Sequence, residues 1–201
     1  MLFLFHKMDL DPIRHHAEAL KGVVDIQIND SQGVVTFGRV GREIWKRTVP
    51  AVLVIVAAIA YGCVLLTVEA VILAVLATAA VCAYLAGLFR KISVNIPDKS
   101  LGFSLFNIMF SEIPFSEYRG PLVYMLTLNG REPSPKEFCA KFWHDGRRKE
   151  VTIANLADGN GPSAKEQLTH ILELWRHLED LMDTDDFDTE FQMSGRNAIF
   201  A

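Results

Sequence analysis

The stretch that decides the fold runs from Val49 to Phe89 and reads VPAVLVIVAAIAYGCVLLTVEAVILAVLATAAVCAYLAGLF, with Glu69 as its only carboxylate. Crossing the hydrocarbon core of a bilayer, about 30 Å thick, takes about 20 helical residues, so this run holds two such lengths. One continuous helix would carry Glu69 to a depth where a charge is costly. Two antiparallel helices, over residues 49–66 and 70–89, place it at the far interface instead. The stretch therefore predicts a transmembrane hairpin within residues 48–89.

Basic residues flank this hairpin on one side only. The connection between the two helices carries none, and the outer flanks carry Arg39, Arg42, Lys46, Arg47, Arg90 and Lys91. Cytoplasmic flanks are the ones enriched in Lys and Arg, so both termini are predicted to face the cytoplasm of a bacterium, in a multi-pass protein of the inner membrane. A soluble protein that buries the same helices is the alternative, and it would need a much larger chain around them.

Composition narrows the remaining classes of protein. The chain has 201 residues, a formal net charge of −4 and 50% hydrophobic residues, which excludes a disordered protein and gives no support to nucleic-acid binding by bulk positive charge. The cysteines Cys63, Cys82 and Cys139 have no spacing typical of a disulfide framework or a zinc site. The N-terminal MLFLFHKMDL lacks a basic start and a cleavage site, so it is not expected to be a signal peptide.

Before the hairpin, the sequence predicts a short helix and a pair of strands. Residues 11–21 are typical of a helix with Asp11 as its N-cap, Pro12 in the first position and Gly22 at its end, and Pro50 suits the first turn of the first membrane helix in the same way. Apolar and polar residues alternate from Val24 to Phe37 on either side of a polar turn, which predicts a β-hairpin.

After the hairpin, the pattern predicts antiparallel strands and one helix. The strands are expected over residues 91–96, 101–106, 108–114, 122–128, 138–143 and 150–153. Asp145-Gly146 predicts a tight turn between the last two. A capping box at Ser163 starts an amphipathic helix over residues 163–182, and the acidic residues 183–201 are expected to be disordered. Since an isolated two-stranded hairpin is unstable in water, residues 1–47 are expected to join residues 90–182 in one cytoplasmic domain.

This order of elements resembles a pleckstrin-homology-like (PH-like) domain, in which a C-terminal helix closes one end of a bent sheet. The segments that carry the resemblance are SEIPFSEYRG (residues 111–120), LVYMLTLNG (122–130) and KFWHDGRRKEVTI (141–153). The chain is similar to small bacterial membrane proteins in which a transmembrane hairpin is inserted in or before such a domain. The resemblance covers residues 23–182 and implies an α+β membrane protein without an assigned activity.

Residues that could hold a metal occur in three places. They are His170, Glu173 and His177 on one face of the last helix; His15 and His16, with His6 nearby; and the acidic tail residues Asp183, Asp185, Asp186, Asp188 and Glu190. The helix face lies opposite the apolar stripe, adjacent histidines diverge by about 100° around a helix, and the tail lacks the order of a calcium loop. We therefore expect all three places to be solvated surfaces, and no metal or cofactor to be bound. The sequence has no nucleophile and base at catalytic spacing, so an enzyme is not predicted.

Two functions remain. The first is a membrane-anchored, non-enzymatic interaction module that binds a protein partner, or a second copy, through a strand edge or the loop Asn129–Lys136. An immunity or inhibitor protein is one form of it. The second is a sensor of anionic lipid headgroups that uses the basic hairpin residues Arg147, Arg148 and Lys149.

Overall fold

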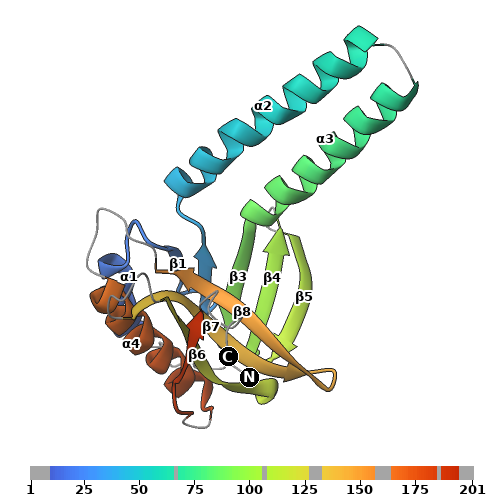
Figure 1. Cartoon of the computed structure of the whole chain (residues 1–201). Helices are drawn as coiled ribbons and strands as arrows, with labels where there is room; N and C mark the ends of the chain where they lie inside the picture. The colour runs from blue at the N-terminus through green and yellow to red at the C-terminus, as the bar shows by residue number, and fades with distance from the viewer. Residues whose placement is uncertain are drawn as a thin grey trace, which may run out of the picture.

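The structure, a computed structural model, describes residues 10–65, 68–105, 108–126, 133–156, 164–184 and 187–194. It is an α+β chain in which two long apolar helices extend from a β-rich body with two sheets and two further helices (Figure 1). The predictions made for His6, Ser163, Asp185, Asp186 and residues 129–132 of the loop Asn129–Lys136 lie outside the described residues.

The two long helices are α2 (Gly41–Leu65) and α3 (Val68–Leu88). Both are long and apolar enough to cross a membrane, by length and composition alone. Glu69 lies in the first turn of α3, where a carboxylate is favoured by the helix dipole. The predicted start of the first helix is wrong, because α2 begins eight residues before Val49 and Pro50 lies inside it. Pro50 therefore removes one backbone hydrogen bond from the helix interior instead of occupying a free N-terminal position.

The first sheet joins strands from both sides of the long helices. Its order is β1 (Asp25–Asn29), β2 (Val34–Gly38), β3 (Arg90–Asn95), β4 (Ser100–Leu105) and β5 (Ile108–Pro114), all antiparallel. Val35 pairs with Val94 and Phe37 with Ile92, so the helical hairpin is inserted between two neighbouring strands. One sheet therefore holds both ends of the hairpin.

The second sheet has the order β8 (Arg147–Asn155), β7 (Ser134–His144), β6 (Tyr118–Leu126) and β9 (Glu190–Ser194). A single 3₁₀ turn, η1 (Phe115–Glu117), leads from β5 into β6. The turn between β7 and β8 is at Asp145-Gly146, both with positive φ, as predicted for a two-residue hairpin. β9 is the one described strand that pairs in parallel, and it forms within the tail that the composition predicted to be disordered.

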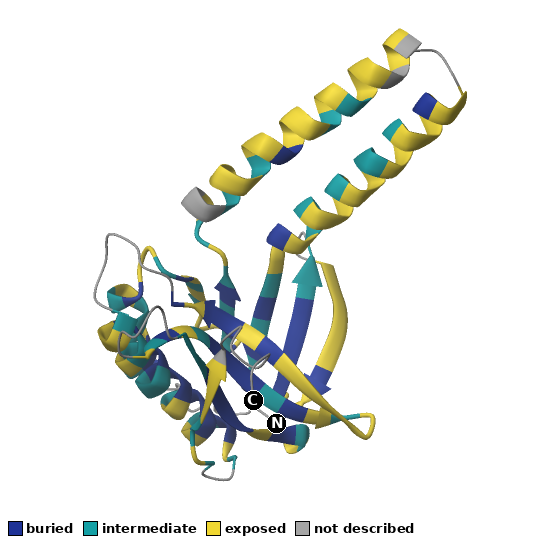
Figure 2. Ribbon diagram, viewed as in Figure 1, coloured by how far each residue is buried: buried dark blue, intermediate teal, exposed yellow. Residues whose placement is uncertain are grey.

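Helix α4 (Ala164–Met182) packs its apolar face on the second sheet, and α1 (Asp11–Ala19) packs on α4. Trp175 is at the centre of the core, with its ring beside those of Phe37, Phe115 and Phe138. The core therefore lies between the two sheets and under α4 (Figures 1 and 2). Asp11 is not the N-cap of α1, as predicted; Leu10 is, and the Asp11 carboxylate instead binds Arg14.

Candidate interaction site

The candidate site is the edge of β6, where the C-terminal tail adds a strand to the second sheet. Residues 190–194 of β9 pair in parallel with Leu122–Leu126, residue by residue. Main-chain hydrogen bonds along an exposed sheet edge are the basis of peptide recognition by strand addition. The described structure thus contains an extended segment already bound to this edge, supplied by the chain itself.

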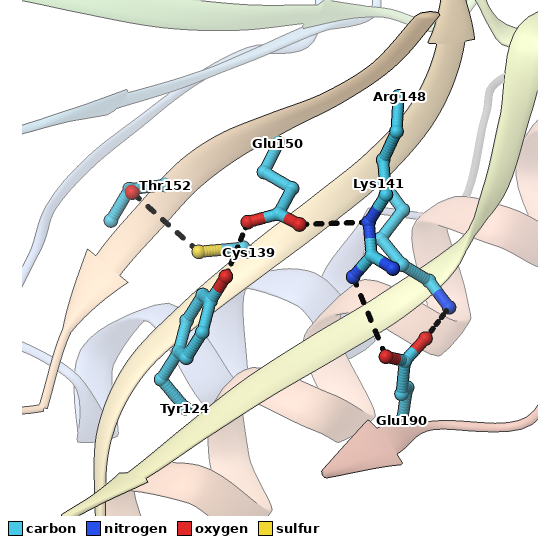
Figure 3. Close-up of polar contacts among 7 residues, drawn as sticks. All are labelled: Tyr124, Cys139, Lys141, Arg148, Glu150, Thr152 and Glu190. Carbon is cyan, nitrogen blue, oxygen red and sulfur yellow. Dashed lines mark hydrogen bonds and ion pairs between the residues drawn. The ribbon is translucent and has the colours of Figure 1, made fainter. Parts of the chain in front are cut away.

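Two ion pairs hold the first residue of β9 to the outer face of the sheet (Figure 3). The Lys141 ammonium donates to Glu190 Oε2 at 2.6 Å, and the Arg148 guanidinium donates to Glu190 Oε1 at 3.4 Å. The hydrogen bond from Lys141 holds the pKa of the Glu190 carboxyl below its usual range. A carboxylate at this position of the added strand is therefore matched by two cations of β7 and β8.

A second carboxylate extends the same row of polar groups across the sheet (Figure 3). Glu150 of β8 accepts a hydrogen bond from the Tyr124 hydroxyl and a 2.8 Å contact from Arg148 Nε. The hydrogen bond to Glu150 raises the pKa of Tyr124 to about 12. Arg148 consequently lies between two carboxylates, one from its own strand and one from the tail.

The chain approaches β9 through Phe187, which packs on β6 at Gly120. Gly120 has φ +98°, and a Cβ atom added there would lie 2.7 Å from the Cβ of Phe187. The Phe187 ring stands edge-on to that of Tyr118, with the centroids 5.5 Å apart. Glycine at position 120 is therefore required twice, by the backbone conformation and by the close approach of the tail.

Beneath this contact lies a buried polar network. The Trp175 Nε1–H donates to the Tyr118 hydroxyl at 2.7 Å, and that hydroxyl donates to Glu179. Burial, with the nearby carboxylate, raises the pKa of Tyr118 well above its usual range. The network therefore ties the start of β6 to α4, next to the point where Phe187 packs on Tyr118.

The basic residues predicted for lipid binding are divided in the structure. Arg147, Arg148 and Lys149 are all exposed on β8. Arg148, however, is engaged by Glu150 and Glu190. Trp143, which pairs with Arg148 across the hairpin, is 53% exposed. Trp143 therefore shares a face with Arg148, and of these three cations Arg147 and Lys149, on the opposite face, are left to face a lipid headgroup.

The basic residues predicted to flank the membrane gather where the long helices join the first sheet. Arg39 lies between β2 and α2, Lys46 and Arg47 are on the first two turns of α2, and Arg90 and Lys91 begin β3. Arg42 is in the first turn of α2, and its side chain lies outside the described residues. These residues therefore lie at the base of the helical hairpin, both where the chain enters α2 and where it leaves α3.

The residues considered for metal binding are placed differently from expectation. The face of α4 that carries His170, Glu173 and His177 is half-buried under α1, not solvated, because His16 packs on it. Among the described residues, no three potential ligands are arranged to hold a metal ion. In the tail, the Asp183 carboxylate lies 3.6 Å from the Lys99 ammonium, and the Glu190 carboxylate forms an ion pair with Lys141.

Sequence patterns assigned no role in binding the tail to Lys141, Tyr124 or Gly120. Their roles depend on the pairing of β6 with β7 and β9, which no local signal encodes. Comparisons of the chain with protein-family models, with curated proteins and with solved structures found no match. The function therefore has to be argued from the site alone.

Proposed function

We propose that the chain is a membrane-anchored, non-enzymatic interaction module, in which α2 and α3 span the inner membrane and a cytoplasmic PH-like domain binds a protein partner by strand addition at the β6 edge. The observation that carries the proposal is the parallel pairing of β9 with β6. Since the tail occupies the edge in this structure, a partner segment would bind in its place.

The chemistry of β9 indicates what such a partner would look like. Its first residue is a carboxylate met by Lys141 and Arg148, and Phe191 and Met193 follow at alternate positions, each 58% exposed. An extended segment that begins with Asp or Glu and continues with alternating apolar residues would reproduce these contacts. Competition with the tethered tail would lower the apparent affinity of any partner in solution, because an intramolecular segment has a high effective concentration.

The direct test uses the tail sequence as the probe. A fluorescent peptide of residues 187–194 is titrated into the purified protein in lipid nanodiscs, either full length or ending at residue 184. Saturable binding to the shortened protein, and binding at least about tenfold weaker to the full-length protein, would support the proposal, since a tethered competitor acts by effective concentration.

The matched control is the same peptide with Glu190→Lys. Repulsion by Lys141 and Arg148 should weaken its binding to the shortened protein several-fold. Equal binding of the two peptides, or no binding of either one, would refute recognition at this edge. A photoreactive residue at Leu126 of β6, in the protein that ends at residue 184, then identifies the protein that binds this edge in native membranes.

Contact of the β7–β8 turn with anionic lipid is the second candidate function, based on the exposed Arg147 and Lys149. The His144 ring contacts Glu117, just after the end of β5 that pairs with Ser100, so this turn lies at the end of the body away from α2 and α3. Such contact is therefore an alternative to the membrane placement proposed above, not an addition to it. The test reverses only the two outer charges, Arg147→Glu with Lys149→Glu, because changing Arg148 would also release Glu190. A probe at Asp145 should be quenched by headgroup-labelled lipid in anionic nanodiscs, and less in neutral ones or in the double variant. Equal quenching in all three would rule this function out.

A further inference from the structure

The first residues of β5 form an exposed apolar patch. Ile108, Met109 and Phe110 are 71%, 54% and 59% exposed, and they follow one another in the chain. Figure 2 shows this start of β5 as exposed, and buried residues of the strand only near its other end, at Ile113. Large apolar side chains in a row on an edge strand favour aggregation unless something covers them.

This patch lies beside the point where α3 enters the first sheet. α3 ends at Leu88 and β3 begins at Arg90; Arg90 pairs with Leu105, and Leu105 pairs with Ile108. Because neighbouring strands are about 4.8 Å apart, Ile108 is about 10 Å across the sheet from Arg90. Figure 1 shows the start of β5 next to the base of α3.

The length of α3 sets the depth of this point in a bilayer. Its 21 residues span about 31 Å, close to the thickness of the hydrocarbon core. If α3 crosses the membrane, Leu88 lies at the boundary of that core. Phe89, Arg90 and the start of β5 then lie at the level of the lipid headgroups.

The side chains around the patch have the composition of a membrane interface. The Arg90 guanidinium lies 4.4 Å from the centroid of the Phe103 ring and 5.9 Å from that of Phe110. Phe89 is exposed next to it, and Trp45 is exposed in the second turn of α2. Aromatic rings and cations with apolar stems are the groups that settle between acyl chains and phosphates.

From this placement we propose that the β4–β5 end of the first sheet, residues Ile108–Phe110, inserts into the headgroup–acyl boundary of the same bilayer that α2 and α3 cross. This inference rests on the membrane anchoring proposed above. Successive residues of a strand point to opposite faces of the sheet, so a single docked protein surface could cover only part of the patch. Lipid can surround an inserted strand end on both faces. The sheet is thereby held at a fixed tilt to the membrane, with the β6 edge presented to the cytoplasm.

The experiment measures the depth of fluorescent probes in the full chain reconstituted in nanodiscs that contain anionic lipid. Single cysteines are introduced at Ile108, at Ile72 of α3 and at Asp98, after the three native cysteines are replaced by alanine. Asp98 is the matched control, because it lies in the exposed turn at the opposite end of the same sheet. Each cysteine carries an environment-sensitive dye, and quenching by nitroxide-labelled lipids is recorded.

We expect the emission of the dye at Ile108 to be shifted to the blue and to be quenched by headgroup-labelled lipid. The dye at Asp98 should keep the emission it has in water and should not be quenched. An unquenched, water-like dye at Ile108 beside a quenched dye at Ile72 would overturn this inference and leave the anchoring intact. A blue-shifted dye at Ile108 that lipid does not quench would also overturn it, in favour of a second copy on the patch. An unquenched dye at Ile72 would instead refute the membrane anchoring itself.

Discussion

The Nδ1 atom of His16, on α1, lies 3.1 Å from the Nδ1 atom of His170, on α4. A hydrogen bond between two imidazole nitrogens needs one of them to be unprotonated, since a protonated pair has two donors and no acceptor. His177 stacks on His16 with the centroids 5.8 Å apart, and His15 stands edge-on to it at 5.3 Å. The contact between α1 and α4 is thus built on a histidine that has to stay neutral.

The docking of α1 should therefore weaken in mild acid. Burial, followed by the charges of His170, His15 and His177, lowers the pKa of His16 below its usual value near 6.5, and Glu173 opposes this only in part. A folded-state pKa below the unfolded one means that the unfolded state binds the proton more tightly. The contribution of neutral His16 to stability is then complete above about pH 6.5, and it is lost progressively as the pH falls from that value through the lower folded-state pKa. Hydrogen exchange of residues 11–19 and the Tm, measured from about pH 8 to 5, would show it.

The variant His16→Asn is the control for this prediction, because it removes the titrating ring and keeps a polar side chain. Its exchange over residues 11–19 should depend much less on pH than that of the parent protein. A parent protein with unchanged protection of α1 across this range would contradict the assignment.

Gly120→Ala should release the tail from the β6 edge. The added methyl group would lie 2.7 Å from the Cβ of Phe187, and the φ of +98° itself costs about 1 kcal/mol for any residue with a Cβ. Because both the strain and the collision act where the tail approaches β9, amide exchange over residues 187–194 should rise strongly. A peptide of residues 188–194, which lacks Phe187, should bind this variant about as tightly as it binds the shortened protein.

Gly22→Ala is a closely matched control for the conformational part of that effect. Its φ is +97°, and no atom lies within 4 Å of an added Cβ. Gly22→Ala should therefore lower the Tm through the backbone conformation alone, while Gly120→Ala should lower the Tm further and also free the tail. Equal exchange of residues 187–194 in the two variants would show that the contact with Phe187 does not hold β9.

The long helices and most strands could be predicted from the sequence because their signals are local. Forty-one residues with one carboxylate leave little choice but a pair of long apolar helices, and alternation over five or six residues defines a half-buried strand. The Asp145-Gly146 pair located the β7–β8 turn for the same reason, since both residues tolerate positive φ.

The candidate site could not be predicted in this way, because the contacts that hold the tail join distant parts of the chain. Glu190 meets Lys141 only after residues 190–194 pair with β6, and the acidic composition of the tail indicated the opposite, a solvated segment. The pairing of His16 with His170 likewise depends on how α1 packs on α4. Local patterns missed it, because the polar face of α4 is indistinguishable in sequence from a solvated one.

Tyr118→Phe should destabilise the protein more than Tyr124→Phe. The first change deprives the buried Trp175 Nε1–H of its acceptor and Glu179 of a donor, at a cost of about 1–3 kcal/mol. The second removes a hydrogen bond at the surface, where Glu150 still binds Arg148, and should cost less than about 1 kcal/mol. For a chain of this size, 1 kcal/mol lowers the Tm by about 2–4 °C, which thermal unfolding in detergent resolves. Equal Tm values for the two variants would contradict a structural role for the buried network.

Cysteine labelling in membrane vesicles should separate a membrane hairpin from a soluble one. Cys63 and Cys82 are exposed on α2 and α3, so they would react at once with a water-soluble maleimide if the helices lay in water. In a bilayer both should stay unlabelled until SDS is added. Cys139 should also stay unlabelled, since burial raises the pKa of its thiol to about 11 and leaves almost no thiolate at neutral pH.

An added cysteine at Asp98 should react in inside-out vesicles and not in right-side-out vesicles, which tests the cytoplasmic placement of the domain. Rapid labelling of Cys63 or Cys82 in intact vesicles would contradict the membrane hairpin, and reversed labelling at position 98 would contradict the orientation alone.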